Sequence, residues 1–114
     1  MTKLVAQGDI LLERVDDARA GTAINVDPDG AIVLAGGEVT GHRHRFTGDT
    51  GVVMFRDDGL ARDVASGLYL GHVVLKQPAR LLHEEHAPIS LPPGTYRVRR
   101  QREFDAGEAR LVAD

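Results

Sequence analysis

The sequence predicts an all-β fold, a single small β-barrel or sandwich of about eight to ten short strands. Thirteen glycines and five prolines divide the 114 residues into short pieces, many of them apolar or alternating. Short strands at regular spacing, with turn signals between them, are typical of sandwiches and barrels. No stretch keeps a helical period apart from one turn expected around residues 106–112. A chain of this length makes one domain, residues 1–114.

In the first half, the candidate strands are residues 9–15, 31–35, 52–56 and 60–64. The second of them follows Asp27-Pro28-Asp29-Gly30, in which Asp, Pro and Gly occupy the positions that a type I turn favours. Asp57-Asp58-Gly59 separates the last two, so we expect those two strands to pair as a hairpin with a short bulged loop.

In the second half, the candidate strands are residues 68–70, 72–76, 79–82, 89–91 and 95–104, with Gly71 and Pro78 as interruptions. The last strand is the longest, and its arginines are Arg97, Arg99, Arg100 and Arg102. A strand with this charge is typical of a subunit interface with acidic groups on a neighbour, or of a free sheet edge. We therefore expect self-association first, a free edge second and nucleic-acid contact last.

The composition excludes several classes of protein. Hydrophobic residues make up 42% and charged residues 27%, which is ordinary for a globular domain. Cysteine is absent, which excludes disulfides, thiol catalysis and thiolate metal sites. The net charge of −3 argues against general nucleic-acid binding. The sequence has no apolar run long enough to span a membrane and no signal-peptide pattern at its start, so we expect a soluble cytoplasmic protein.

Four of the five histidines form two short clusters. In the first, His42 and His44 lie two residues apart. On a strand, both imidazoles would project from the same face about 6.6 Å apart at the backbone. Arg43 and Arg45 would then lie on the opposite face.

The second cluster is His83-Glu84-Glu85-His86. In a helical turn its histidines would be neighbours, whereas on a strand each histidine would share a face with one carboxylate. Imidazole and carboxylate are the usual ligands of zinc, iron, manganese or nickel where cysteine is absent. Either cluster alone also fits a solvated face or a surface turn. His72 is expected to point outward from its strand and is left out of the site.

The first histidine cluster lies in a segment that resembles the first signature of the cupins, small β-barrels that commonly hold a metal inside. That signature is a glycine, five residues, His-x-His, three or four residues, a glutamate, and later a glycine. Gly36, His42 and His44 fall in place, and Asp49 occupies the glutamate position. Arg56 stands where the closing glycine is usual.

The second cupin signature, Pro-x-Gly-x-x-His, is matched in part. Pro92 and Gly94 supply the turn, but Arg97 replaces the histidine ligand. The resemblance therefore implies a cupin-like metal site only if His83 or His86 supplies the missing ligand from the preceding segment.

A second likeness covers nearly the whole chain. Residues 37–45, 83–89 and 94–104 are similar to segments of a group of short bacterial proteins of unknown function. This likeness implies no activity.

Two functions follow as hypotheses. The first is a small cupin-like metal-binding protein with a divalent first-row transition metal, whose candidate ligands are His42, His44, His83, His86 and Asp49. Glu38, Glu84 or Glu85 could replace Asp49, and Glu84 or Glu85 would be the general base of any reaction. The second is a non-enzymatic, homo-oligomeric assembly or binding module in which the clusters are structural or interface groups. The sequence leaves open whether the chain is an enzyme, and which small molecule it would bind.

Overall fold

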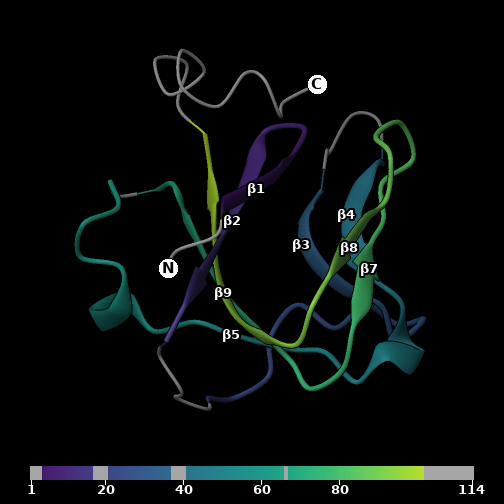
Figure 1. The fold of residues 1–114 in the computed structure, drawn as a ribbon, viewed down its shortest axis with the longest axis horizontal. Coiled ribbons are helices and arrows are strands. Elements are labelled where there is room, and N and C mark those ends of the chain that lie inside the picture. Colours follow the sequence, from purple (N-terminus) through teal and green to yellow (C-terminus); the bar gives the residue numbers. More distant parts are fainter. Residues whose placement is uncertain (1–3, 17–20, 37–40, 66, 102–114) are drawn as a thin grey trace.

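The computed structural model describes residues 4–16, 21–36, 41–65 and 67–101, and these residues form an all-β domain, as predicted (Figure 1). The strands are β1 (Leu4–Gln7), β2 (Ile10–Val15), β3 (Ile32–Gly36), β4 (Arg43–Phe46), β5 (Val53–Phe55), β6 (Tyr69–Leu75), β7 (Ala79–Leu81), β8 (Ile89–Leu91) and β9 (Gly94–Arg100). Two short 3₁₀ turns are η1 (Gly48–Thr50) and η2 (Asp58–Leu60). The helical turn expected around residues 106–112 lies outside the described residues.

The strands form one large sheet and two strand pairs. The large sheet is antiparallel, with the strand order β1-β2-β9-β6-β5. β3 pairs with β4, and β7 pairs with β8. An isolated bridge between Arg45 and Leu82 joins these pairs. Figure 1 shows β1, β2 and β9 on one side of the domain and β3, β4, β7 and β8 on the other. The described strands do not close into a barrel, so the sandwich alternative fits better and a cupin-like barrel is not confirmed.

The hydrophobic core is built from apolar residues of both sides of this sandwich. Its fully or almost fully buried members include Ile10, Leu12, Leu34, Phe46, Met54, Val73, Leu81, Leu91, Tyr96 and Val98. Along β9, burial alternates as a strand with one core face requires. The Tyr96 hydroxyl donates a hydrogen bond to the Pro92 carbonyl oxygen at 2.7 Å, which satisfies the polar end of this buried ring.

The hairpin expected around Asp57 does not form, because β5 pairs with β6 instead. The Asp57 carboxylate accepts a hydrogen bond from the Gly59 N–H at 3.0 Å. The expected strand at residues 60–64 is absent, because Leu60 ends η2 and the chain turns at residues 62–63, where Arg97 donates to the Asp63 carboxylate at 2.6 Å. Side-chain bonds of this kind replace the ladder that the hairpin would have made.

The sequence suggested that Gly71 interrupts the chain between two strands, but the structure shows no interruption there. Gly71 lies inside the continuous strand β6, where the pairing with β9 shifts register. Its φ is +150°, and a Cβ atom there would lie 2.8 Å from the Phe55 carbonyl oxygen. Glycine therefore allows β5 to approach closely, rather than ending the strand.

The expectation that His72 points outward was wrong, because His72 is fully buried. Its ring stacks on Phe55 with centroids 5.3 Å apart. The Tyr69 hydroxyl oxygen lies 2.7 Å from His72 Nδ1 and accepts from the Asp57 N–H at 3.1 Å. The rings of Phe55 and Tyr69 therefore cover His72 on the face of β6 that the sequence pattern left to solvent.

The arginine-rich strand β9 is the middle strand of the large sheet, not an edge. Arg97 forms ion pairs with Glu13 and Asp63, and Arg100 pairs with Asp9. The hydrogen bond from Arg97 lowers the pKa of Asp63 below its usual value. Because these arginines find acidic partners within the chain, a partner subunit is not needed to neutralise them. Self-association stays a prediction. Residues 102–104 of the expected strand lie outside the described part of the chain.

Candidate functional site

The two histidine clusters meet where β4 lies beside the end of β7. The Arg45 N–H donates to the Leu82 carbonyl oxygen at 3.0 Å, and the Leu82 N–H donates to the Arg45 carbonyl oxygen at 2.9 Å. In an antiparallel pair, the neighbouring residues His44 and His83 then face each other across the strands. Their ring centroids are 4.2 Å apart. The backbone pairing therefore explains why the clusters converge.

The other two histidines extend this contact into a group of four rings. The chain bends at residues 84–86, which returns His86 to His83 with a centroid separation of 4.6 Å. His86 lies nearly parallel to His44 at 6.1 Å, and His42 meets His83 edge-on at 5.6 Å. The metal hypothesis required the two clusters to lie side by side, and they do.

A third segment, the turn between β1 and β2, touches the same rings and was missed in the sequence. Gly8 has a φ of +58°, and a Cβ atom there would lie 2.6 Å from His86 Nε2 and 3.3 Å from His44 Cε1. Only glycine leaves room for both rings in this conformation. The next residue, Asp9, has Oδ1 3.5 Å from His44 Nε2. The available signal was Gln7-Gly8-Asp9, a polar tripeptide between two apolar runs.

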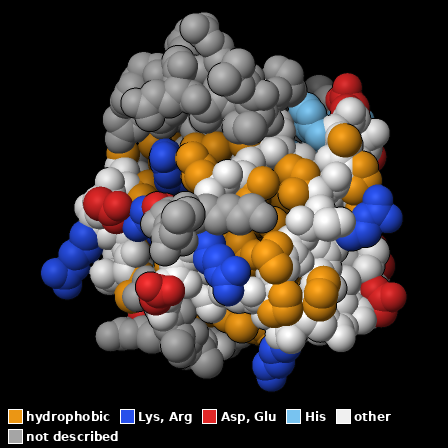
Figure 2. Space-filling model, in the orientation of Figure 1, with side chains coloured by type: hydrophobic (Ala, Val, Ile, Leu, Met, Phe, Trp, Pro, Cys, Tyr) orange, Lys and Arg blue, Asp and Glu red, His pale blue; other side chains and the backbone are white. Residues whose placement is uncertain are grey.

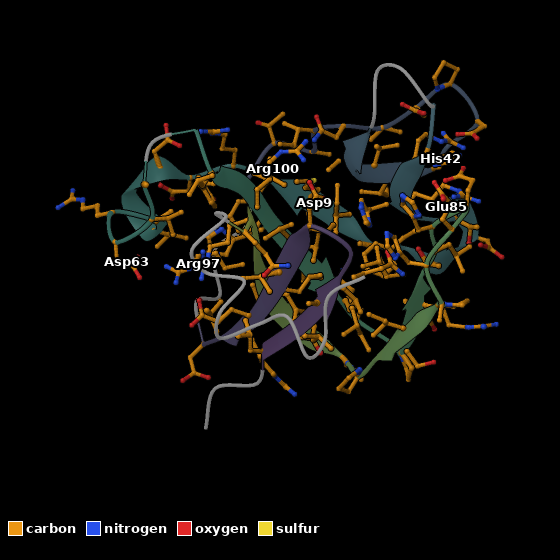
Figure 3. The ribbon with its side chains drawn as sticks, turned by 90° about the horizontal axis from the view of Figure 1, so that it is seen from above. Asp9, His42, Asp63, Glu85, Arg97 and Arg100 are labelled. Atoms are coloured by element: carbon orange, nitrogen blue, oxygen red, sulfur yellow. The ribbon has the colours of Figure 1, made fainter. Side chains whose placement is uncertain are left out.

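Three of the four rings, those of His42, His44 and His83, line a cavity of about 220 Å³ together with charged side chains, and His86 packs against His83 and His44 beside it. Its lining residues are Asp9, Ala35, Gly36, His42, His44, His83, Glu85 and Arg100. Glu85 Oε1 lies 2.7 Å from His42 Nδ1, and Arg100 donates to Asp9 Oδ2 at 2.8 Å. Figure 3 shows His42 and Glu85 on the opposite side of the molecule from Arg97 and Asp63, with Asp9 and Arg100 between these two groups. Histidine atoms also reach the surface in Figure 2, near an acidic side chain. This volume is smaller than the cavities that hold drug-sized ligands and suits an ion or a molecule of a few atoms.

Of the two candidate general bases, only Glu85 lines the cavity. The Glu84 carboxylate accepts from the Arg43 N–H at 2.8 Å and from Arg45 Nη1 at 3.3 Å. The backbone hydrogen bond from Arg43 is the main reason that the pKa of Glu84 is lowered. Glu84 therefore ties the second histidine cluster to β4.

The structure does not bring Asp49 to the histidines. His42 comes just before β4, whereas Asp49 comes after the other end of that strand, in η1. There its carboxylate accepts a hydrogen bond from the Thr47 hydroxyl at 2.5 Å. Glu38, the other candidate from this segment, lies outside the described residues.

Burial and the neighbouring imidazoles lower the pKa values of His44 and His83. The pKa of His44 is lowered to about 4, chiefly by burial and then by the charge that His83 would carry. The pKa of His83 is lowered for the same first reason, with His86 as the next cause. At neutral pH, His44 is therefore a neutral imidazole, which is the form that binds metals.

Metal ligation would require the side chains to rearrange. Within the described ranges, no group of three or more His, Asp or Glu residues is already placed to hold a metal ion. His42 is engaged with Glu85, and His44 Nδ1 lies 2.9 Å from Gln7 Oε1. The site is thus a group of imidazoles and carboxylates on one cavity, in hydrogen-bonded positions.

In a comparison with known families, one family model matches residues 6–101, which include most of the described domain. The chain belongs to this family, DUF8820, a domain of unknown function. The match agrees with the likeness to short uncharacterised proteins and gives no support to the cupin resemblance. No curated protein and no solved structure matches the chain. The part of this DUF8820 domain that the structure describes contains no helix long and apolar enough to cross a membrane.

Proposed function

We propose that this DUF8820 domain binds a divalent first-row transition metal, with His44, His83 and His86 as the imidazole ligands. The observation that carries the proposal is the group of four imidazole rings, which come from two segments far apart in the sequence. Imidazole suits zinc, copper, iron and nickel, and the chain has no cysteine to compete for them.

The spacing of the rings is compatible with ligation after small side-chain rotations. In a tetrahedral site with nitrogens about 2.1 Å from the metal, two ligand nitrogens lie about 3.4 Å apart. The ring centroids of His44, His83 and His86 are 4.2 to 6.1 Å apart. Rotation about the side-chain bonds can bring nitrogens at these separations into range without moving the strands.

The charge of the cavity also favours a cation. Asp9 and Glu85 are acidic and Arg100 is basic, so these three lining groups together carry one negative charge when ionised. A divalent ion would reverse that charge, and it would interact favourably with both carboxylates. Glu85 could then act as a base toward a bound molecule, since it lines the same cavity.

The second candidate is a non-enzymatic binding or assembly module, with self-association as the corresponding proposal. It is favoured by the pairs His42–Glu85 and Asp9–Arg100, in which charged or polar groups already have protein partners. In this candidate the histidines are structural. Light scattering on the purified domain would separate an assembly from a monomer.

Calorimetric titration of Zn²⁺ into tag-free, chelator-treated protein at neutral pH tests the metal proposal. We expect one ion per chain, and the same affinity in Asp49→Asn, because Asp49 lies away from the rings. Absence of binding by the parent protein would reject the metal proposal in favour of the second candidate. A large loss of affinity in Asp49→Asn would reject the assignment of the site to this cavity.

A further inference from the structure

Gln7 is a buried polar side chain beside His44, with only 2% of its surface exposed. Its amide nitrogen donates to the carbonyl oxygens of Leu81 and Ala87, both at 3.0 Å. These two carbonyls lie just before and just after the second histidine cluster. The Gln7 amide therefore ties both ends of that loop to β1.

The same two carbonyls determine which way the Gln7 amide points. If its nitrogen and oxygen were exchanged, an oxygen would face both carbonyl oxygens at 3.0 Å with no hydrogen between them. Gln7 Oε1 must therefore face His44, where it lies 2.9 Å from Nδ1. An amide oxygen can only accept a hydrogen bond, so His44 Nδ1 must carry the hydrogen.

We infer that Gln7 is a positioning residue, which holds His44 in the tautomer with hydrogen on Nδ1 and leaves the Nε2 lone pair facing Asp9. Asp9 Oδ1 and His44 Nε2 are then two acceptors 3.5 Å apart, a pair that a bound cation would bridge. The consequence of this tautomer for metal binding rests on the proposed function. It adds Asp9 as an oxygen ligand and His44 Nε2 as the ligating atom.

The opposite tautomer would let His44 Nε2 donate to Asp9, so the two hydrogen bonds compete. The hydrogen bond from His44 Nδ1 to Gln7 should be the one that forms. Its contact is shorter, at 2.9 Å against 3.5 Å for Asp9, and the side chain of Gln7 is buried. In the opposite tautomer, the lone pair of His44 Nδ1 would face Gln7 Oε1, and it would be left without a hydrogen bond away from water. Asp9 is 58% exposed and already accepts a hydrogen bond from Arg100. An outer hydrogen bond that fixes the tautomer in this way is the usual companion of a metal-binding histidine.

Long-range ¹H–¹⁵N correlation spectra of the metal-free protein at neutral pH test the tautomer directly. We expect His44 to show a protonated Nδ1 and an unprotonated Nε2 in the parent protein and in Gln7→Glu, which keeps an acceptor oxygen. Gln7→Met, which has no such oxygen, should lose this preference. The opposite tautomer in the parent protein would overturn the inference, whether or not the protein binds metal.

Zinc affinity separates positioning from loop attachment. Loss of the outer hydrogen bond in Gln7→Met should weaken binding about 10- to 100-fold, whereas Gln7→Glu should stay much closer to the parent. Gln101→Leu is the matched control, because Gln101 also bonds this turn, through the Gly8 carbonyl oxygen at 3.0 Å, without touching His44. Equal losses in Gln7→Glu and Gln7→Met would overturn positioning, while zinc binding by the parent would leave the proposed function standing.

Discussion

Replacing His44 and His83 together by alanine is expected to lower the affinity for zinc at least about 100-fold, since even outer hydrogen-bond partners of a metal site are worth about 10- to 100-fold. The two rings face each other at 4.2 Å, and each comes from a different histidine cluster. Their removal leaves no ligand pair that joins the two segments. Calorimetric titration of the variant against the parent protein measures the loss.

The control is His42→Ala, which should weaken binding much less. The side chain of His42 is 30% exposed against 6% for His44, and its Nδ1 already lies 2.7 Å from the Glu85 carboxylate. Circular dichroism should first show that the double variant keeps its strands. A folded double variant with the parental zinc affinity would exclude His44 and His83 as ligands.

Gly8→Ala is expected to weaken zinc binding at least about 10-fold while costing about 1–2 kcal/mol of folding stability. The stability cost comes from the left-handed backbone at φ +58°. The loss of binding comes from the new Cβ, which would lie 2.6 Å from His86 Nε2 and push that ring aside. Thermal melts and zinc titrations on the same samples measure the two effects.

Gly51→Ala is the matched control for backbone strain. Gly51 has a similar φ of +72°, but a Cβ atom there would meet nothing within 4 Å. It should therefore lose a similar amount of stability and keep its zinc affinity. If both variants bound zinc like the parent, His86 would have no place in the site.

The fold class and most strand positions could be predicted because their signals are local. β2, β3, β7 and β8 follow apolar runs between glycines and prolines, and their bounds agree with the sequence to within a residue or two. Strand pairing depends on contacts far apart in the chain. The Asp57 loop therefore suggested the wrong partner for β5, and the charges on β9 suggested an edge although the strand lies in the middle of the sheet.

The candidate site was only partly visible for the same reason. The two histidine clusters stand out in the sequence, but the bridge between Arg45 and Leu82 that joins them does not. Asp49 was chosen by its spacing from His44, yet β4 ends at Phe46 and the chain turns into η1 before reaching it. Gln7 was missed because nothing in its own segment indicates that its amide will meet a histidine from β4.

An anomalous difference map at the zinc edge, from crystals of the tag-free protein grown with Zn²⁺, tests the metal site most directly. We predict one strong peak where the cavity meets His86, about 2.1 Å from His44 Nε2 and within ligating distance of His83 and His86. A map with no peak there, or with peaks only on other surfaces, would contradict the claim that these converging imidazoles form a metal centre.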